Sequence, residues 1–116
     1  MDSSKIALLV FITLILGITT LYIIDKPPIV EKARGPSGEI SKMMSSFSWH
    51  GEDPDGIIIK YEYRKDGGKW IGVGESTRYI WVGYSEGEHT FDVRARDING
   101  KSSEIVSWTF FYKPNP

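Results

Sequence analysis

The sequence predicts an all-β domain, a sandwich of seven antiparallel strands, that follows one hydrophobic helix. The helix is indicated by residues 6–24, which include no charged side chain and no proline. The sandwich is indicated by the residues after Asp25, where turn-forming Gly, Pro, Asp and Asn recur at short intervals. The segments between these turns are about five to ten residues long and rich in β-branched and aromatic residues, as sandwich strands are. The chain therefore divides into an apolar segment and a β domain.

The apolar run is long enough to cross a bilayer. As a helix, its nineteen residues would extend about 28 Å, and the hydrocarbon core of a bilayer is ~30 Å thick. The alternative is a cleaved signal peptide, whose apolar core is usually ~7–15 residues long and ends at a small-x-small site. Here the last residues before Asp25 are Tyr22, Ile23 and Ile24, which are bulky. We therefore expect a retained, single-pass membrane anchor.

We expect three parts in the chain: a short leader and the hydrophobic helix in residues 1–24, a linker in 25–28 and the β-sandwich in 29–116. The soluble part has the size of one small domain. The chain has no cysteine, so packing and not disulfides must stabilise this domain. The 14 Lys and Arg residues nearly balance the 15 Asp and Glu residues. This balance predicts that the protein does not bind nucleic acid.

Seven segments have the pattern of strands, each bounded by turn residues. They are residues 29–32, 44–50, 57–64, 70–73, 77–82, 88–96 and 103–112. Because successive side chains of a strand point to opposite faces, the alternation within a segment predicts which of its residues are buried. The predicted core residues are Phe47, Trp49, Ile59, Tyr61, Tyr63, His89, Phe91, Val93 and Ala95.

Charged residues alternate with this predicted core in two of the strands. They are Lys60, Glu62, Arg64, Asp92, Arg94 and Arg96. If strands 57–64 and 88–96 pair, these side chains lie together on one outer face, where cross-strand ion pairs contribute ~0.2–1 kcal/mol each. A solvated ion-pair face is the main interpretation, and an anion-binding patch formed by the three arginines is the alternative.

Four segments carry a resemblance to a known family. They are FSWHGEDPDG at 47–56, YEYRKDGGKW at 61–70, GEHTFDVRARDINGKSSE at 87–104 and WTFFY at 108–112. They resemble the fibronectin type III-like, immunoglobulin-like domains of secreted and cell-surface proteins of bacteria and archaea. The resemblance implies that Trp49 is the core tryptophan of the second strand. It also implies that His89 takes the position where many relatives have a corner tyrosine, which leaves open whether the corner hydrogen bond forms.

Two signals on the orientation of the soluble domain disagree. Lys26, Lys32 and Arg34 follow the hydrophobic run, whereas Lys5 precedes it, so the positive-inside rule favours a cytoplasmic domain. The resemblance instead implies a domain outside the cytoplasm. Since folded domains translocate despite a few flanking charges, we expect an extracytoplasmic domain on the cell membrane.

The sequence contains no motif of a catalytic centre. G-x-S-x-G, H-E-x-x-H and the glycine-rich phosphate loop are all absent from it. We therefore predict no catalytic residue, no cofactor and no enzymatic activity. The one candidate metal site is a pair of loops where Asp53, Asp55 and Asp97 offer oxygen ligands for calcium. The favoured interpretation is that these aspartates bond to the local backbone in turns.

Four apolar residues lie on the strand faces opposite to the predicted core. Ile80 and Val82 belong to one strand, and Ile105 and Phe111 belong to the last strand, which we expect in the other sheet. They predict two small candidate interfaces. A separate group of aromatic residues is the alternative candidate, as a surface that stacks on sugars: Trp70, Trp81 and Tyr84.

The predicted function is that of a membrane-anchored, extracytoplasmic structural or interaction subunit that displays one β-sandwich. Its expected partners are membrane lipid or further copies of itself, through the helix, and other envelope or surface proteins. One alternative is a pilin-like subunit of an extracellular filament with the hydrophobic helices in its core. Another is a secreted carbohydrate-binding module. The four-residue linker spans at most ~14 Å, and the first strand starts at the end with the acidic loop, so we expect this loop to face the membrane.

Overall fold

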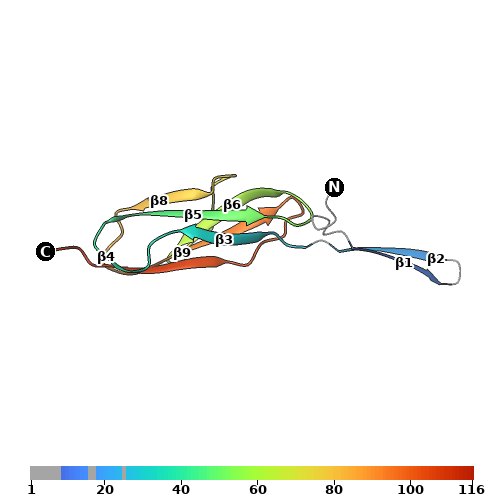
Figure 1. Ribbon diagram of the computed structural model, residues 1–116, viewed down its shortest axis with the longest axis horizontal. Coiled ribbons are helices and arrows are strands. Elements are labelled where there is room, and N and C mark those ends of the chain that lie inside the picture. Colours follow the sequence, from blue (N-terminus) through green and yellow to red (C-terminus); the bar gives the residue numbers. More distant parts are fainter. Residues whose placement is uncertain (1–8, 16–17, 25) are drawn as a thin grey trace.

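The computed structural model describes residues 9–15, 18–24 and 26–116, and for the first two ranges only the backbone. Eight strands form a sandwich of two sheets (Figure 1). One sheet has the order β3-β5-β8, and the other has the order β4-β10-β9-β6-β7. The strands are β3 (Ile29–Arg34), β4 (Gly38–Ile40), β5 (Met44–Glu52), β6 (Ile58–Lys65), β7 (Ile71–Gly72), β8 (Arg78–Val82), β9 (Gly87–Asp97) and β10 (Val106–Tyr112). The predicted all-β sandwich is confirmed.

The sandwich has one strand more than predicted, which is β4. It pairs in parallel with the end of β10, so that Gly38 lies opposite Phe110 and Ile40 opposite Tyr112. The chain therefore crosses from the three-stranded to the five-stranded sheet between β3 and β4. A strand of three residues is too short to show alternation, so the sequence shows only the turn residues around it.

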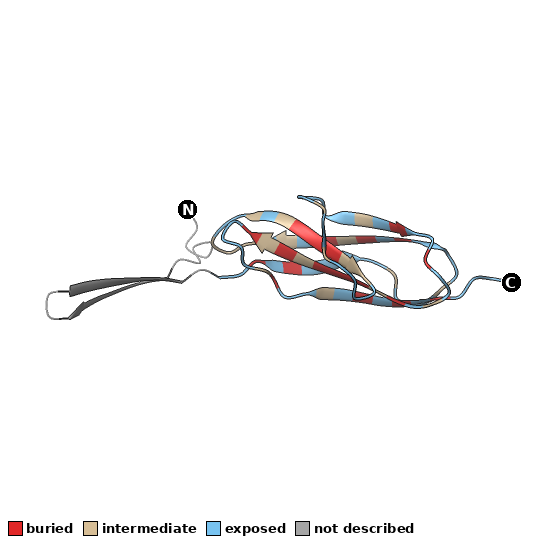
Figure 2. Cartoon of the chain, turned by 180° about the vertical axis from the view of Figure 1, so that it is seen from behind, coloured by how far each residue is buried: buried red, intermediate tan, exposed pale blue. Residues whose placement is uncertain are grey.

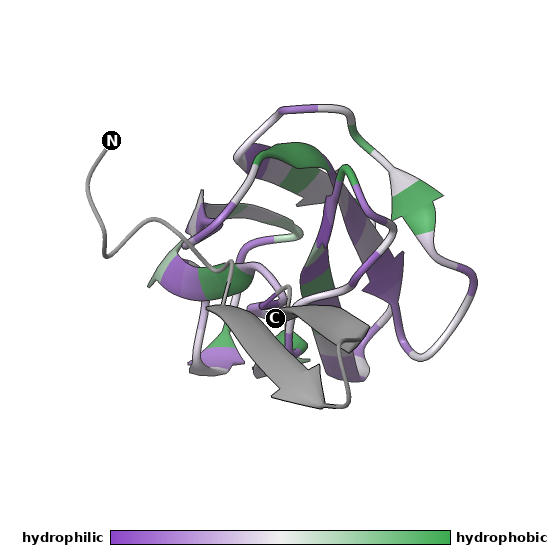
Figure 3. Ribbon diagram, turned by 90° about the vertical axis from the view of Figure 1, so that its right-hand side faces the viewer, coloured by the Kyte–Doolittle hydropathy of each residue, from purple (hydrophilic) through white to green (hydrophobic). Residues whose placement is uncertain are grey.

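Aromatic rings fill the space between the two sheets. Phe47, Phe91 and Phe110 are almost inaccessible to solvent, and the rings of Phe47 and Phe91 stack with their centroids 4.0 Å apart. Figure 2 shows that buried residues belong mainly to the strands, and Figure 3 shows hydrophobic and hydrophilic residues alternating along them. The alternation confirms these predicted core residues: Phe47, Trp49, Tyr61, Tyr63, His89, Phe91, Val93 and Ala95.

The prediction that Ile59 is a core residue is wrong. Its side chain is 45% exposed, and the neighbouring Ile58 packs against the core instead. The cause is a register shift in β6: Ile58 lies opposite Asp97 and Lys60 opposite Arg96, so β6 has one extra residue there. Such a bulge reverses the alternation of the strand locally.

The N-terminal segment differs from the predicted helix. Its described residues form two antiparallel strands, β1 (Leu9–Ile15) and β2 (Ile18–Ile24), while residues 1–8, 16–17 and 25 lie outside the described part of the chain. More than half of the residues in these two strands are β-branched, and β-branched residues favour strands. Among the described residues, no helix has the length and apolar character that crossing a membrane requires.

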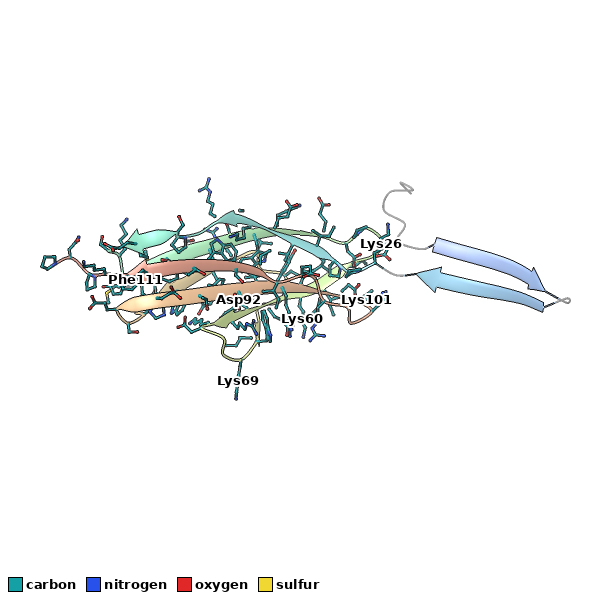
Figure 4. The ribbon with its side chains drawn as sticks, turned by 90° about the horizontal axis from the view of Figure 1, so that it is seen from below. Lys26, Lys60, Lys69, Asp92, Lys101 and Phe111 are labelled. Atoms are coloured by element: carbon teal, nitrogen blue, oxygen red, sulfur yellow. The ribbon has the colours of Figure 1, made fainter. Side chains whose placement is uncertain are left out.

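The chain enters the sandwich at the end that carries the acidic loop, as predicted. The N–H group of Lys26 donates a hydrogen bond to Asp55 Oδ2 at 2.9 Å. The loop after β9 lies at the same end: Figure 4 labels both Lys26 and Lys101 there, and the N–H of Ile98 donates to the carbonyl of Ile57. We call this the entry end. The C-terminus lies at the opposite, distal end (Figure 1).

Candidate interaction surfaces

Hydrogen bonds from the backbone hold the acidic loops of the entry end. Asp97 Oδ1 accepts from the N–H groups of Asn99 at 2.9 Å and Lys101 at 2.8 Å. Asp53 Oδ1 accepts from the N–H of Asp55 at 3.3 Å. Hydrogen bonds of this kind, from nearby backbone N–H groups to aspartate oxygens, are what the turn interpretation predicts. Within the described part of the chain, no three His, Cys, Asp or Glu side chains form a group that could hold a metal ion.

The pKa of Asp53 is raised by its surroundings in the acidic loop. Its burial, its hydrogen bond with Asp55 and the negative charges of Asp55 and Asp97 raise the pKa of Asp53 to about 6. The ordinary value is 3.8. A raised carboxyl pKa stabilises the fold fully below the unfolded value, and this contribution is lost as the pH rises through the folded value. At neutral pH the ionised Asp53 therefore destabilises the acidic loops of the entry end.

We expect Asp53→Asn to raise the unfolding temperature at about pH 7.5 by several degrees, since about 1 kcal/mol corresponds to about 4–8 °C in a domain of this size. At about pH 4 the two proteins should unfold at nearly the same temperature, because Asp53 is then protonated. Differential scanning calorimetry measures both. The exposed neighbour Glu52, as Glu52→Gln, is the control. The same measurement with added calcium tests the alternative interpretation of this loop. A calcium ion bound by these carboxylates would raise the unfolding temperature of the unmodified protein more than that of the variant.

The charged outer face of the five-stranded sheet forms as predicted. The register of β6 and β9 sets these residues opposite one another: Lys60 and Arg96, Glu62 and Arg94, Arg64 and Asp92. Glu62 Oε1 accepts from Nε of Arg94 at 3.0 Å and of Arg96 at 2.9 Å. Asp92 Oδ2 accepts from Nε of Arg64 at 2.6 Å. The three arginines already pair with carboxylates, which favours the ion-pair interpretation over an anion-binding patch.

Trp70 packs against two of these arginines. Its ring centroid lies 4.5 Å from the guanidinium carbon of Arg64 and 4.1 Å from that of Arg94, within the range of cation–π attraction. Trp81 and Tyr84 are instead buried in the core. The three aromatic residues considered for sugar stacking therefore share no exposed surface.

Glu62→Gln tests this ion-pair face. Burial would raise the pKa of Glu62, but the hydrogen bonds and charges of Arg96 and Arg94 outweigh it and hold the pKa below its ordinary value of 4.5. We expect the variant to lose about 1–3 kcal/mol of unfolding free energy near neutral pH, because two guanidiniums lose their carboxylate. The loss should shrink as the pH falls below 4.5, where the glutamate itself protonates. Urea titrations at two pH values measure it, and Glu88→Gln, at an exposed site of β9, should change little.

His89 makes the corner hydrogen bond that the sequence left open. Its Nε2 lies 2.6 Å from the carbonyl oxygen of Ser85, four residues earlier, and its Nδ1 lies 2.8 Å from Asp66 Oδ2. A carbonyl and an ionised carboxylate only accept hydrogen bonds, so these two contacts favour the protonated ring, in which both nitrogens donate. Burial lowers the pKa of His89, but the bonds to Asp66 and Ser85 outweigh it, so the pKa is raised.

Ile80 and Val82 are exposed on the outer face of β8, at 52% and 62%. Met44 lies opposite Val82 in the register of β5 and β8, and it is 54% exposed. We call these three residues the sheet-face patch. The sequence analysis did not identify Met44, although its alternation with Phe47 and Trp49 places it on the outer face.

Ile105 and Phe111 are also exposed, but they lie at different ends of the sandwich. Phe111 is near the distal end, far from Lys26 (Figure 4). Ile105 precedes β10 and lines a hollow of about 390 Å³ together with the segment that enters β3, including Pro28 and Ile29. Ile80 and Val82 therefore share one face, whereas Ile105 and Phe111 do not form a second small surface together.

Isoleucines are exposed at the entry end. They are Ile29, Ile57, Ile59, Ile98 and Ile105. Ile57 and Ile98 are exposed at 62% and 63%, and the N–H of Ile98 donates to the Ile57 carbonyl at 3.1 Å, which joins their two loops. Gathered apolar side chains mark a contact surface. Only Ile105 was identified as exposed from the sequence. Ile57 and Ile98 lie outside the strands, where no alternation shows exposure, and Ile59 lies at the bulge of β6.

Solved structures share this two-sheet arrangement. The chain is similar to the fibronectin(III)-like modules of Clostridium thermocellum CbhA, with a TM-score of 0.66 and 24% identity over 83% of this chain and 52% of that one. The fold is fibronectin type III-like. A PKD domain of an M14-like peptidase from a Thermoplasmatales archaeon matches 78% of this chain with 99% of its own, at a TM-score of 0.61 and 19% identity.

A third similar structure is the extracellular domain of a hybrid two-component system from B. thetaiotaomicron. It matches 78% of this chain with 16% of its own length, at a TM-score of 0.55 and 19% identity. The chain thus spans about half of the solved chain of CbhA modules, at 52%, and 16% of the extracellular domain from B. thetaiotaomicron. No protein-family model and no curated protein matches the chain. The likenesses establish the fibronectin type III-like, immunoglobulin-like fold.

Proposed function

We propose that the protein is a membrane-anchored, extracytoplasmic structural or interaction subunit that displays one fibronectin type III-like domain. The observation that carries the proposal is the group of exposed isoleucines at the entry end, where the apolar residues 6–24 join the domain. An apolar segment followed directly by an end of a folded domain that exposes several isoleucines suits a membrane surface. The similarity to an extracellular domain supports a position outside the cytoplasm.

The backbone hydrogen bonds of the apolar segment decide which conformation it can adopt in lipid. Residues 9–15 and 18–24 form a two-stranded hairpin, and a lone hairpin is marginally stable in water. In a bilayer, both of its edges would leave backbone groups unpaired, whereas a helix pairs them internally. We therefore expect residues 6–24 to be helical in lipid. Far-ultraviolet circular dichroism of the full chain should gain a helical signal in lipid bicelles, and an unchanged β spectrum would contradict this anchor.

The distal half of the sandwich offers surfaces for other proteins. Met44 and Val82 lie at the far end of β5 and β8, and Phe111 lies near the end of β10. A domain that rests on the membrane with its entry end presents these side chains away from the lipid. Their exposure on two different sheets suits contacts with more than one neighbouring protein.

Cell fractionation tests the proposal. The full chain, expressed in bacteria, should sediment with membranes, resist alkaline extraction and dissolve in mild detergent, and protease added to spheroplasts should digest the sandwich. A mature protein that begins at Asp25, or a protein soluble without detergent, would contradict the anchor. Helical filaments in electron micrographs would favour the pilin-like alternative.

A spin-labelled lipid tests the contact at the entry end. In bicelles, the label should broaden the amide signals of Ile57 and Ile98. Ile71, an isoleucine of β7 that is 48% exposed and lies away from the entry end, is the matched control. Equal broadening at all three residues would show that the domain does not rest on the membrane with this end.

A further inference from the structure

We propose that the outer face of the three-stranded sheet carries a binding site for a phosphate or sulfate ester. The site is a hollow of about 420 Å³ lined by Arg34, Ser46, Ser48, Thr77 and Arg78. These side chains offer two guanidinium and three hydroxyl groups, and none of them is acidic. All of these groups donate hydrogen bonds, which phosphate and sulfate oxygens accept, and arginine binds such anions through paired donors.

The strand register brings the two arginines to either side of one serine. Arg34 of β3 lies opposite Ser48 of β5, and Ser48 lies opposite Arg78 of β8. Neighbouring strands are ~4.8 Å apart, so the two arginine backbones are about 10 Å apart with Ser48 between them. Arginine side chains are long enough to converge above the serine. The row therefore allows two guanidinium groups and a hydroxyl to reach one anion bound above Ser48.

A bulge in β3 turns Arg34 toward this face. Lys32 lies opposite Trp49 and Arg34 opposite Ser48, so β3 has one extra residue between them. Without this extra residue, Arg34 would share the side of Lys32, whose Nζ donates to the Ser107 carbonyl at 2.9 Å. Bulges commonly re-aim a side chain beside a functional site.

The charges of this row have no ion-pair partner in the part of the sandwich that the structure describes. Within residues 26–116, neither Arg34 nor Arg78 takes part in an ion pair. The arginines of the other sheet are all paired, as Arg64 is with Asp92. The two guanidiniums lie on β3 and β8, the strands on either side of β5, where like charges repel each other, and a bound anion would offset that repulsion.

The surroundings of the hollow favour an ester over a free ion. The sheet-face patch begins in the next row of the sheet, where Ile80 lies opposite Ser46. An organic group that carries the anion has an apolar surface to contact there, and an inorganic ion has none. We therefore expect sugar phosphates or sulfates to bind more tightly than inorganic phosphate or sulfate.

Nuclear magnetic resonance of the full chain in neutral micelles tests the site, with glucose 6-phosphate, glucose 6-sulfate, inorganic phosphate and inorganic sulfate as probes at constant ionic strength. The Nε–H signals of Arg34 and Arg78 and the amide of Ser48 should shift and saturate. Tighter binding of the sugar esters supports the ester site as proposed. Equal binding of all four probes would contradict the role of the apolar surface.

Paired variants separate the site from general charge effects. Arg34→Gln together with Arg78→Gln should weaken binding at least about tenfold, since the charge-assisted hydrogen bonds of both guanidiniums are lost. Arg96→Gln removes a charge from the opposite sheet and should leave binding unchanged. Both arginines of the site are exposed, so the double variant should keep its unfolding temperature. Shifts that do not saturate, or equal affinities in both variants, would overturn the proposal.

Discussion

Replacing Phe91 with alanine should lower the free energy of unfolding by about 3–5 kcal/mol. The Phe91 ring is fully buried and stacks with the rings of Phe47, Tyr63 and Tyr79 at centroid distances of 4.0, 5.4 and 5.5 Å. Removing it leaves a cavity among rigid rings that cannot close it. Since domains are stable by only about 5–15 kcal/mol, the variant should retain little of its stability. Urea titration followed by tryptophan fluorescence measures the change.

Phe111→Ala is the matched control for this change. The same side chain is removed from the neighbouring strand, but Phe111 is 43% exposed. Its removal should cost less than about 1 kcal/mol, as for most surface positions. Equal losses in the two variants would mean that the core is not centred on Phe91.

Replacing His89 with alanine should lower the free energy of unfolding by about 2–4 kcal/mol at about pH 6, because the Ser85 carbonyl and the Asp66 carboxylate both lose a charged donor. The effect should depend on pH. The pKa of His89 is raised from its ordinary 6.5, so its stabilisation is complete below pH 6.5 and is lost as the pH rises through the folded value. The difference between the two proteins should therefore shrink toward about pH 9.

His50→Ala controls for the removal of a histidine. The His50 side chain is 68% exposed, and its contact with Glu52 at 3.4 Å is long, so we expect almost no change at any pH. Asp53, whose pKa is about 6, titrates in the variant as in the unmodified protein, so its effect cancels in the difference between them. A His89→Ala variant with a constant loss from pH 6.5 to about pH 9 would show that the ring is neutral in the folded protein.

Much of the sandwich could be predicted because alternation is a local property. Phe91 and Asp92 lie on opposite faces of one strand whatever that strand pairs with, so their environments follow from sequence order. Pairing of β6 with β9 could then be predicted, because it places the charged side chains of both strands on one outer face. The positions of His89 and Trp49 in the core follow from the same alternation.

The prediction failed where strand register or long-range contacts determine whether a residue is buried or paired. Ile59 is exposed because β6 has one residue more than its partner, and no pattern within β6 shows this. β4 exists because it pairs with β10. The exposed Ile57 and Ile98 come together only when their two loops meet at the entry end.

The sequence by itself determined the class of the domain, the faces of its regular strands and the apolar character of residues 6–24, because each depends on neighbours in the chain. The tertiary structure decided the corner bond of His89, the exposed isoleucines of the entry end and the row formed by Arg34, Ser48 and Arg78. Each of these joins residues from different strands or loops. Their positions depend on bulges and on strand register, which are set by the packing of the whole sandwich.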